Sequence, residues 1–229
     1  EWYSLQKILR QEWVESSLLD LEQEEPDDLM MHPLRLALEV QSLMNQNDWL
    51  VIDGGNTHFW SEIAVNMAGA QGKELAGILH PGSFSMLGVG VSFGLAAKLN
   101  HPKDRVVVIS GDGAFLSGGL SIEAAFQENV PITVVIDNNG GLTTISQQQE
   151  RLFADERHVA TDFRDIPFHT MFEGMGGHGE LVEKPEDLKA ALERALSSGK
   201  TACVNVRTRS AISPIVLATT SKRDKASIE

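Results

Sequence analysis

Three short segments rich in Asp, Asn and Gly are the part of this sequence best suited to chemistry. They are residues 53–57 (DGGNT), 111–115 (GDGAF) and 137–141 (DNNGG), and each follows an apolar run. Taken singly, each segment is typical of a turn, because Asp-Gly and Asn-Gly dipeptides favour turns. Carboxylate, amide and carbonyl oxygens are also the ligands that Mg²⁺ prefers, together with the oxygens of a bound phosphate. The residue types therefore indicate either ordinary turns or a magnesium and phosphate site.

The apolar runs that precede these segments predict the strands that position them. Residues 49–53 (WLVID) have the composition of a strand. Residues 105–110 (RVVVIS) and 132–136 (ITVVI) have that of strands buried on both faces of a parallel sheet. Helical patterns lie at residues 36–44, 58–70, 86–99, 122–126 and 185–196, and residues 202–206 are the last predicted strand. Alternating strands and helices predict an α/β domain over residues 32–208, a doubly wound parallel sheet with helices on both faces.

The predicted topology brings Asp112 and Asn139 to one edge of the sheet. Each follows a strand of the same β-α-β unit, and parallel strands end at the same edge, where ligands bind in open α/β sheets. A helix is expected to begin within a few residues of Asp112, so the backbone N–H groups of Ala114 and Phe115 are candidates to face phosphate oxygens.

Composition excludes several classes of protein. The chain has 229 residues, of which 42% are hydrophobic and 22% charged, which argues against intrinsic disorder, and no apolar run is long enough to span a membrane. The net charge of -13 disfavours nucleic-acid and anionic-membrane partners. Cys203 is the single cysteine and cannot form an intramolecular disulfide, so we expect a cytoplasmic location.

The two ends of the chain differ from the predicted domain. Residues 1–31 are acidic around Pro26 and are expected to be a helical linker or the end of a preceding domain. Residues 209–229 are expected to be a polar tail. The sequence begins at Glu1 without a methionine, so we also expect a missing upstream part.

The spacing of two of the polar segments resembles a known family. Gly111-Asp112-Gly113, followed after 24 residues by Asn138-Asn139, resembles the signature of thiamine diphosphate enzymes. The resemblance extends over residues 32–208 to the pyrophosphate-binding domain of the acetolactate synthase-like group, which includes benzaldehyde lyase, oxalyl-CoA decarboxylase and 2-hydroxyacyl-CoA lyase. It implies a thiamine diphosphate-binding fold in which Asp112, the Asn139 side chain and the main-chain oxygen of Gly141 bind Mg²⁺.

The same resemblance implies the residues that contact the cofactor. Leu87, 25 residues before Asp112, matches the position whose side chain wedges between the two rings of the cofactor, although ordinary core is the alternative. The Ser85 carbonyl would accept a hydrogen bond from the 4'-amino group of the cofactor. Asn56 and Thr57 would touch the diphosphate, or else cap the helix that follows. The glycine turn is expected to border the cofactor through Gly111, Gly113, Ala114 and Phe115, and segment 139–149 to lie over it.

The resemblance also identifies what this chain lacks. In the family the activating glutamate belongs to a separate N-terminal pyrimidine-binding domain, and the segment before Pro33 is too short to be one, so no catalytic residue is assigned. We expect the chain to match the C-terminal third of an enzyme that is a dimer or tetramer, with FAD in the missing part as an open alternative. His58, His80 and His178 are candidates for acid-base groups, with structural roles as the alternative.

The resemblance implies a carboligase or lyase that makes or breaks carbon-carbon bonds next to the carbonyl of 2-keto or 2-hydroxyacyl substrates. A coenzyme A-linked enzyme of the 2-hydroxyacyl-CoA lyase or oxalyl-CoA decarboxylase type is an alternative. A catalytically silent binding or regulatory module is a second. A nucleotide-binding Rossmann domain is a third, which the absence of G-x-G-x-x-G after the first strand disfavours.

Overall fold

The computed structural model describes residues 30–153, 158–214 and 216, together with Ser4, Ile8 and Glu12. The remaining parts of the expected linker and of the expected tail lie outside these residues. Among the described residues, no helix is both long and apolar enough to cross a membrane.

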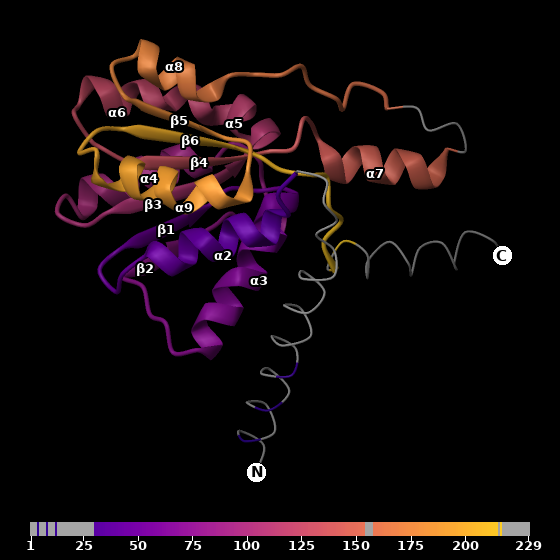
Figure 1. Ribbon diagram of the computed structural model, residues 1–229, viewed down its shortest axis with the longest axis horizontal. Helices are drawn as coiled ribbons and strands as arrows, with labels where there is room; N and C mark the ends of the chain where they lie inside the picture. Colours follow the sequence, from indigo (N-terminus) through magenta and orange to yellow (C-terminus); the bar gives the residue numbers. More distant parts are fainter. Residues whose placement is uncertain are drawn as a thin grey trace.

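A parallel sheet of six strands forms the centre of the domain, as predicted (Figure 1). The order of the strands across the sheet is β2-β1-β3-β4-β6-β5. The strands are β1 (Trp49–Ile52), β2 (Gly77–Leu79), β3 (Val106–Gly111), β4 (Thr133–Asn138), β5 (His178–Val182) and β6 (Ala202–Arg207). Neighbouring strands are parallel throughout, with Ile109 opposite Ile52 on one side and Val135 on the other. This register places the carboxyl ends of β1, β3 and β4 side by side.

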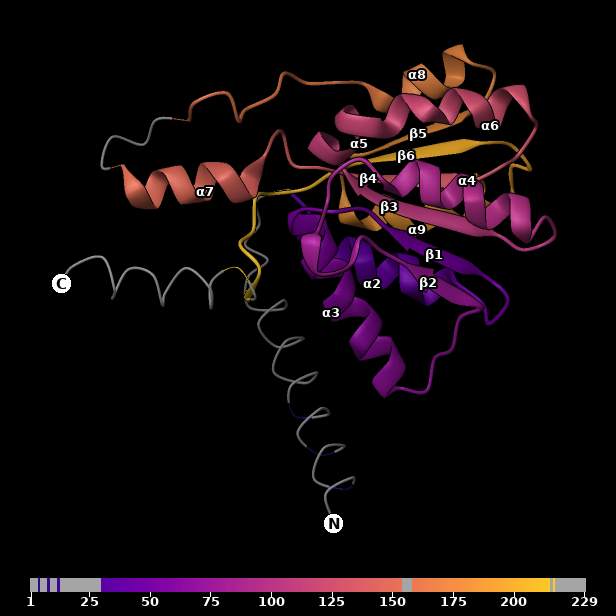
Figure 2. The same cartoon turned by 180° about the vertical axis from the view of Figure 1, so that it is seen from behind.

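Helices cover both faces of the sheet, which confirms the doubly wound prediction (Figures 1 and 2). One face carries α2 (Pro33–Leu43), α3 (Asn56–Ala70) and α9 (Leu188–Ser197), and the other α4 (Gly90–Asn100), α5 (Asp112–Gly118), α6 (Glu123–Gln127) and α8 (Phe168–Gly174). Short 3-10 turns lie at η1 (Gly82–Phe84), η2 (Gly119–Ile122) and η3 (Pro185–Asp187). Coverage of both faces explains why the central strands are continuous runs of Val and Ile.

Successive side chains of each strand enter opposite layers of the core. Leu50 and Ile52 of β1 pack with the layer of α2 and α9, whereas Val51 packs with the layer of α4, α5 and α8. The second layer includes the rings of Phe115 and Phe168, whose centroids are 5.5 Å apart. Burying such a side chain contributes roughly 1.5–3 kcal/mol, so these two layers hold the strand ends in place.

Helix α4 begins later than the sequence pattern predicts. The expected helix over residues 86–99 starts at Gly90, and residues 85–89 form a loop, called here the Leu87 loop. Gly88 has a φ of 86°, which a helix cannot contain, and the N–H groups of Gly88 and Val89 donate to the Asp53 carboxylate. Tertiary hydrogen bonds therefore override a helical composition here.

The beginning of the expected C-terminal tail packs against the domain. The carbonyl of Ala211 accepts hydrogen bonds from Asn56 Nδ2 at 2.7 Å and from Trp60 Nε1 at 3.2 Å. Ser213 is fully buried. Residues 209–213 of the expected tail thus pack beside α3.

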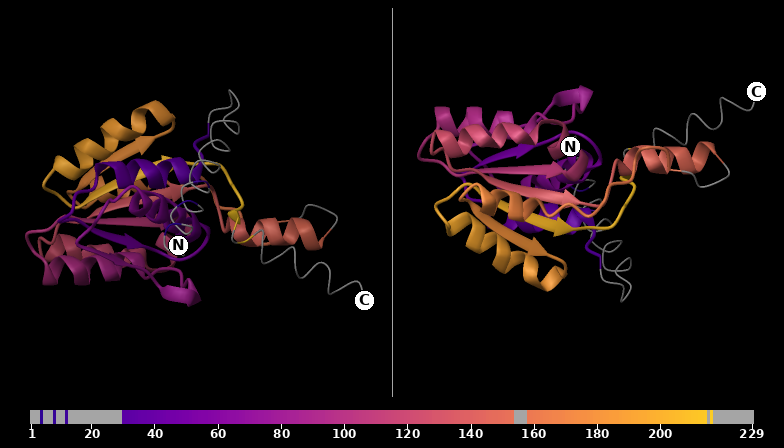
Figure 3. Two further views of the ribbon diagram at one scale, coloured as in Figure 1. Left: turned by 90° about the horizontal axis from the view of Figure 1, so that it is seen from below. Right: turned by 90° about the horizontal axis from the view of Figure 1, so that it is seen from above.

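Helix α7 (Thr143–Leu152) projects from the body beyond the carboxyl end of β4 (Figures 1 and 3). The turn before it is tied to the segment that returns to α8, because Gly141 and Asp162 form an isolated antiparallel bridge. The projecting helix and its return segment therefore start at the edge of the sheet where the three polar segments end.

Candidate functional site

The three polar segments meet in a pocket of about 280 Å³ at the carboxyl ends of β1, β3 and β4. The pocket is also bordered by the first turns of α3 and α7. Most of the residues predicted for the site line it: Asn56, Thr57, Ser85, Leu87, Gly111, Asp112, Gly113, Ala114, Asn139 and Gly141. Phe115 does not line the pocket, because its side chain packs on the rings of Phe168 and Phe172.

Asp112 and Asn139 supply the oxygen atoms that suit a cation. Burial raises the pKa of Asp112 to about 7, and the nearby Asp137 carboxylate also raises it, although hydrogen bonds from backbone N–H groups oppose the shift. The side-chain oxygen of Asn139 is buried and has no hydrogen-bond partner within the described part of the chain. A buried carboxylate next to an unpaired amide oxygen is a costly arrangement that a divalent cation would relieve. These residues therefore fit Mg²⁺.

The Gly140-Gly141 turn closes over Asp112. Both N–H groups donate to Asp112 Oδ2 at 2.9 Å, and both residues have positive φ angles, 83° and 159°. A Cβ atom on Gly141 would lie 2.3 Å from the Thr161 carbonyl oxygen, so a larger residue does not fit. The Gly141 carbonyl, the expected third ligand, accepts from Thr143 N–H at 2.9 Å and keeps a second lone pair.

The first polar segment is organised by a buried carboxylate that the sequence did not single out. Asp137 Oδ2 accepts a 2.6 Å hydrogen bond from the Thr57 hydroxyl, and its other oxygen accepts from the Thr208 hydroxyl. Burial raises the pKa of Asp137, while these two hydrogen bonds lower it. The position of Asp137 directly before Asn138-Asn139 was a usable signal, but its partners lie far away in the sequence.

Asn56 and Thr57 do not cap α3 with their side chains. The N-cap of this helix is Gly55, with a φ of 92°, and no side chain bonds to it as a cap. The Thr57 hydroxyl is engaged with Asp137, and Asn56 Nδ2 with the Ala211 carbonyl. The alternative of a side-chain cap is therefore wrong. The first N–H groups of α3 have no side-chain cap and lie at the end of the helix that borders the pocket.

The Leu87 loop is fastened to the end of β1. Asp53 Oδ1 accepts from the N–H groups of Gly54, Gly88 and Val89 at 2.9–3.1 Å, and Oδ2 accepts from the Ser110 hydroxyl at 2.8 Å. Leu87 itself is 38% exposed and lines the pocket, so it is not ordinary core. An apolar side chain held at a pocket wall by a rigid loop suits contact with an apolar part of a ligand.

Ser85 lies where the Leu87 loop meets Gly54. A Cβ atom on Gly54 would lie 2.2 Å from the Ser85 carbonyl oxygen, so the two backbones approach as closely as glycine allows. Ser85 has a φ of 45°, and its hydroxyl accepts from Gly55 N–H at 3.0 Å. The carbonyl expected to accept from a cofactor thus packs beside the backbone of Gly54.

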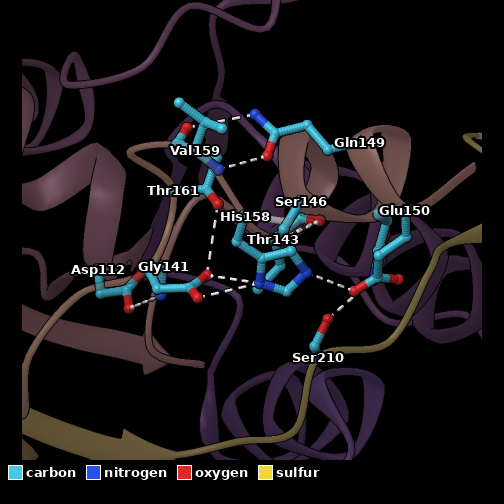
Figure 4. A network of polar contacts seen from close by, with 12 residues as sticks. Asp112, Gly141, Thr143, Ser146, Gln149, Glu150, His158, Val159, Thr161 and Ser210 are labelled. Carbon is cyan, nitrogen blue, oxygen red and sulfur yellow. Dashed lines mark hydrogen bonds and ion pairs between the residues drawn. The ribbon is translucent and has the colours of Figure 1, made fainter. Parts of the chain in front are cut away.

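A polar network links α7 to the turn over Asp112 (Figure 4). His158 lies between Glu150 of α7, 2.7 Å from Nε2, and Asp162, 2.9 Å from Nδ1. These two carboxylates raise the pKa of His158. Gln149 adds a second link through the backbone of Val159. Because Asp162 is bridged to Gly141, the network joins the projecting helix to the Gly140-Gly141 turn over Asp112.

The three histidines singled out from the sequence lie outside the pocket lining. His178 is on β5 and pairs with Glu180 at 2.8 Å. His58 and His80 lie on either side of Glu62, behind Ser85. The geometry gives none of them a place against a ligand in the pocket.

Comparisons with known proteins agree with this geometry. Residues 53–206 match the family described as "Thiamine pyrophosphate enzyme, C-terminal TPP binding domain". An acetolactate synthase large subunit of Mycobacterium tuberculosis is 35% identical over 198 residues, which cover 85% of this chain and 35% of that protein. A 2-hydroxyacyl-CoA lyase 2 of Mus musculus is 30% identical over 174 residues, or 76% of this chain and 26% of that protein. The chain spans about a third or less of the length of these relatives.

Proposed function

Because the chain belongs to the thiamine pyrophosphate enzymes, through their C-terminal cofactor-binding domain, we propose that its pocket holds the diphosphate and Mg²⁺ of that cofactor. The observation that carries the proposal is the pair formed by the buried Asp112 carboxylate and the unpaired Asn139 oxygen. When bound, thiamine diphosphate supplies an electron sink for the carbanion left when a bond next to a carbonyl breaks. The chain's own residues bind and orient it.

Asp112, the Asn139 side chain and the Gly141 carbonyl are the proposed metal ligands. They are hard oxygen donors, and three protein ligands leave positions for phosphate oxygens and water around an octahedral ion. Glycine allows the positive φ angles of the Gly140-Gly141 turn, and the two N–H hydrogen bonds to Asp112 would hold the turn in place beside the metal.

The diphosphate is proposed to lie at the first turn of α3. Asn56 and Thr57 would contribute their backbone N–H groups, because both side chains already donate elsewhere. Gly111, Gly113 and Ala114 line the same side of the pocket and leave room for phosphate oxygens. Any contact from Phe115 would come from its backbone, since its ring belongs to the core.

The Leu87 side chain is proposed to support the organic rings of the cofactor, with the Ser85 carbonyl as an acceptor beside it. The hydrogen bonds from Gly88 and Val89 to Asp53 make this wall rigid. A rigid wall favours one bent shape of a flexible ligand, and holding reacting groups close lowers the entropic part of a barrier.

The complete enzyme is proposed to be a carboligase or lyase that acts on 2-keto or 2-hydroxyacyl compounds. The relatives named acetolactate synthase and 2-hydroxyacyl-CoA lyase support this class, and the second name supports an acyl-CoA substrate as the alternative. The domain would work with a pyrimidine-binding domain or subunit, in a dimer or tetramer. Residues 1–31 and the end of the chain would connect or extend it, and the single cysteine supports a cytoplasmic location.

Calorimetric titration tests the cofactor proposal. Thiamine diphosphate is titrated, with Mg²⁺, into the complete enzyme that contains this domain, into Asp112→Ala and into Glu193→Ala. Glu193 is exposed on α9, so its replacement removes the same charge away from the pocket. Binding that Asp112→Ala abolishes and Glu193→Ala preserves supports the proposal. Binding unaffected by Asp112→Ala contradicts it.

Product analysis separates the two substrate classes. The complete enzyme is incubated with Mg²⁺, thiamine diphosphate and either pyruvate or a 2-hydroxyacyl-CoA. Formation of acetolactate from pyruvate supports the carboligase, whereas release of an aldehyde from the acyl-CoA supports the lyase.

A further inference from the structure

His58, Glu62 and His80 form a cluster of metal-ligating groups next to the cofactor pocket. One ligand atom from each side chain lies within 4.8 Å of the other two. His58 and Glu62 are one turn apart on α3, which places them on the same face of the helix, and His80 joins them from the segment that leads into η1. The cluster is separate from Asp112, Asn139 and Gly141.

The distances within the cluster are close to those around a single small ion. Glu62 Oε1 is 3.0 Å from His58 Nε2 and 3.8 Å from His80 Nδ1. Ligands bound to one Zn²⁺ at about 2.0–2.2 Å lie about 3.4 Å apart in a tetrahedron, so small rotations of the partly exposed Glu62 and His80 side chains would suffice. His80 Nδ1 also accepts a long 3.3 Å bond from Gly82 N–H, which a metal at that atom would replace.

His58 directs its Nε2 atom toward Glu62 in the cluster. The residue is only 3% exposed, and its Nε2 atom is buried without an aligned hydrogen bond to any described residue, even though the Glu62 oxygen is at ion-pair distance. A buried polar atom of this kind is rare unless an ion or water completes its surroundings.

The other ring nitrogen of His58 is held by a neighbour, as in metal-binding histidines. Nδ1 lies 3.0 Å from the Ser85 hydroxyl, which fixes the orientation of the ring. Burial lowers the pKa of His58, despite the opposing effect of Glu62, and favours the neutral imidazole that binds metals. Orientation and protonation state both leave Nε2 available.

We propose that His58, Glu62 and His80 form a second metal site that binds Zn²⁺. Two imidazoles and one carboxylate suit Zn²⁺ with water as the fourth ligand, whereas Mg²⁺ prefers oxygen donors alone. Because two ligands come from α3 and the third from the segment before the Leu87 loop, the ion ties that segment to the helix. The proposal is independent of the proposed function.

Metal titration of the complete protein tests the site. With Mg²⁺ present in excess, Zn²⁺ is titrated by calorimetry, and Co²⁺ is added in parallel to record the visible absorption of a tetrahedral ion. Glu62→Gln and His80→Ala are the test variants, because both side chains are partly exposed and neither belongs to the buried core. His101→Ala is the matched control, since His101 is a similarly exposed histidine paired with one carboxylate, Asp104.

We expect one Zn²⁺ bound per chain, a tetrahedral Co²⁺ spectrum, and at least about tenfold weaker binding in Glu62→Gln and His80→Ala but not in His101→Ala. The midpoint of thermal unfolding should rise with Zn²⁺ in the parent protein and not in His80→Ala. Binding must also persist in Asp112→Ala, which excludes Zn²⁺ in the Mg²⁺ site. Absence of binding, or binding that Glu62→Gln and His80→Ala leave unchanged, would overturn the proposal.

Discussion

Asp53 at the end of β1 and Gly88 in the Leu87 loop are joined by a 2.9 Å hydrogen bond from the Gly88 N–H to the Asp53 carboxylate. The same carboxylate oxygen also accepts from Gly54 and Val89. One buried side chain thus fixes the position of the loop that carries Leu87 relative to the glycine turn at the pocket.

Replacement of Asp53 by Ala should loosen this loop. It leaves the backbone N–H groups of Gly88 and Val89 without their acceptor, and each buried donor that stays unsatisfied costs about 1–3 kcal/mol. We expect lower stability in urea unfolding and weaker binding of thiamine diphosphate. Glu193→Ala, which removes an exposed carboxylate in the middle of α9, should change neither quantity. Unchanged cofactor affinity in Asp53→Ala would show that the loop is fixed by other contacts.

Leu87→Ala should affect cofactor binding far more than stability. Leu87 is 38% exposed, so its loss should change the free energy of unfolding by about 0.5 kcal/mol or less. If the side chain supports the cofactor rings, the dissociation constant should rise by about tenfold or more, because a contact of about 1.4 kcal/mol is lost. Leu99→Ala on α4, where the leucine is 63% exposed, is the control. Equal affinities in the two variants would refute the role of Leu87.

Gly54→Ala should be strongly destabilising, whereas Gly69→Ala should not. The added methyl group at position 54 would lie 2.2–2.3 Å from the carbonyl oxygens of Ser85 and Met86, which are backbone atoms that cannot move aside cheaply. At position 69, in the last turn of α3, the methyl group meets nothing within 4 Å, and alanine should stabilise the helix by up to about 1 kcal/mol. Thermal unfolding of the two variants measures the contrast, and similar midpoints would contradict it.

Asp112 should make the Mg²⁺-free protein less stable as pH rises. Its pKa is about 7 in the folded protein against 3.8 in an exposed carboxyl, so the folded state holds this proton more tightly than the unfolded chain. The resulting stabilisation is complete below about pH 4 and is lost as pH rises to about 7, with an upper bound on the order of 4 kcal/mol. Urea unfolding in a chelator between about pH 5 and pH 8 tests this.

The Asp112→Asn variant is the control for that pH dependence, and it should flatten the curve. Cofactor affinity should follow the opposite trend, rising with pH, because a metal ligand must be deprotonated. A parent protein whose unfolding free energy is flat over this range would contradict the raised pKa.

His158 should hold α7 more firmly at low pH than at high pH. Its pKa is raised by hydrogen bonds to Glu150 and Asp162, so the stabilisation is complete below its ordinary value of 6.5 and is lost as pH rises through the folded value. Hydrogen exchange of the amides of 143–152, corrected for the intrinsic rate, should be faster in His158→Gln than in the parent near pH 6. The difference should disappear at high pH, and His101→Gln should behave like the parent. Identical protection in His158→Gln at low pH would exclude the contact.

The central strands and two of the polar segments could be predicted because their signals are local. Continuous Val and Ile runs mark β3 and β4, shorter apolar runs mark β1 and β6, and the spacing between Asp112 and Asn139 carries the metal-site prediction. The edge strands β2 and β5 were missed because they are short and only partly buried, with polar residues such as Glu180 among them. Helix α7 was missed because its Gln-rich sequence has no apolar stripe facing a core.

Parts of the site that depend on distant residues could not be predicted from the sequence. The Asp137 carboxylate is held by hydrogen bonds from Thr57 and Thr208. The start of α4 depends on the hydrogen bond from the Gly88 N–H to the Asp53 carboxylate. The third member of the cluster with His58 and Glu62 is His80, which lies in a different segment of the chain. In each case a hydrogen bond or ion pair across the fold decides the structure, and local propensity does not report it.

The two hydrogen bonds of Asp137 join distant parts of the chain. Thr57 lies 80 residues before it in the sequence and Thr208 lies 71 residues after it, so this carboxylate stays incompletely bonded until β6 has been synthesised and docked. A chain that ends before β6 would lack the Thr208 hydroxyl, so Asp137 would keep only the hydrogen bond from Thr57. We therefore expect the pocket to bind its cofactor only after β6 has joined the sheet. A chain truncated before β6 should not bind the cofactor.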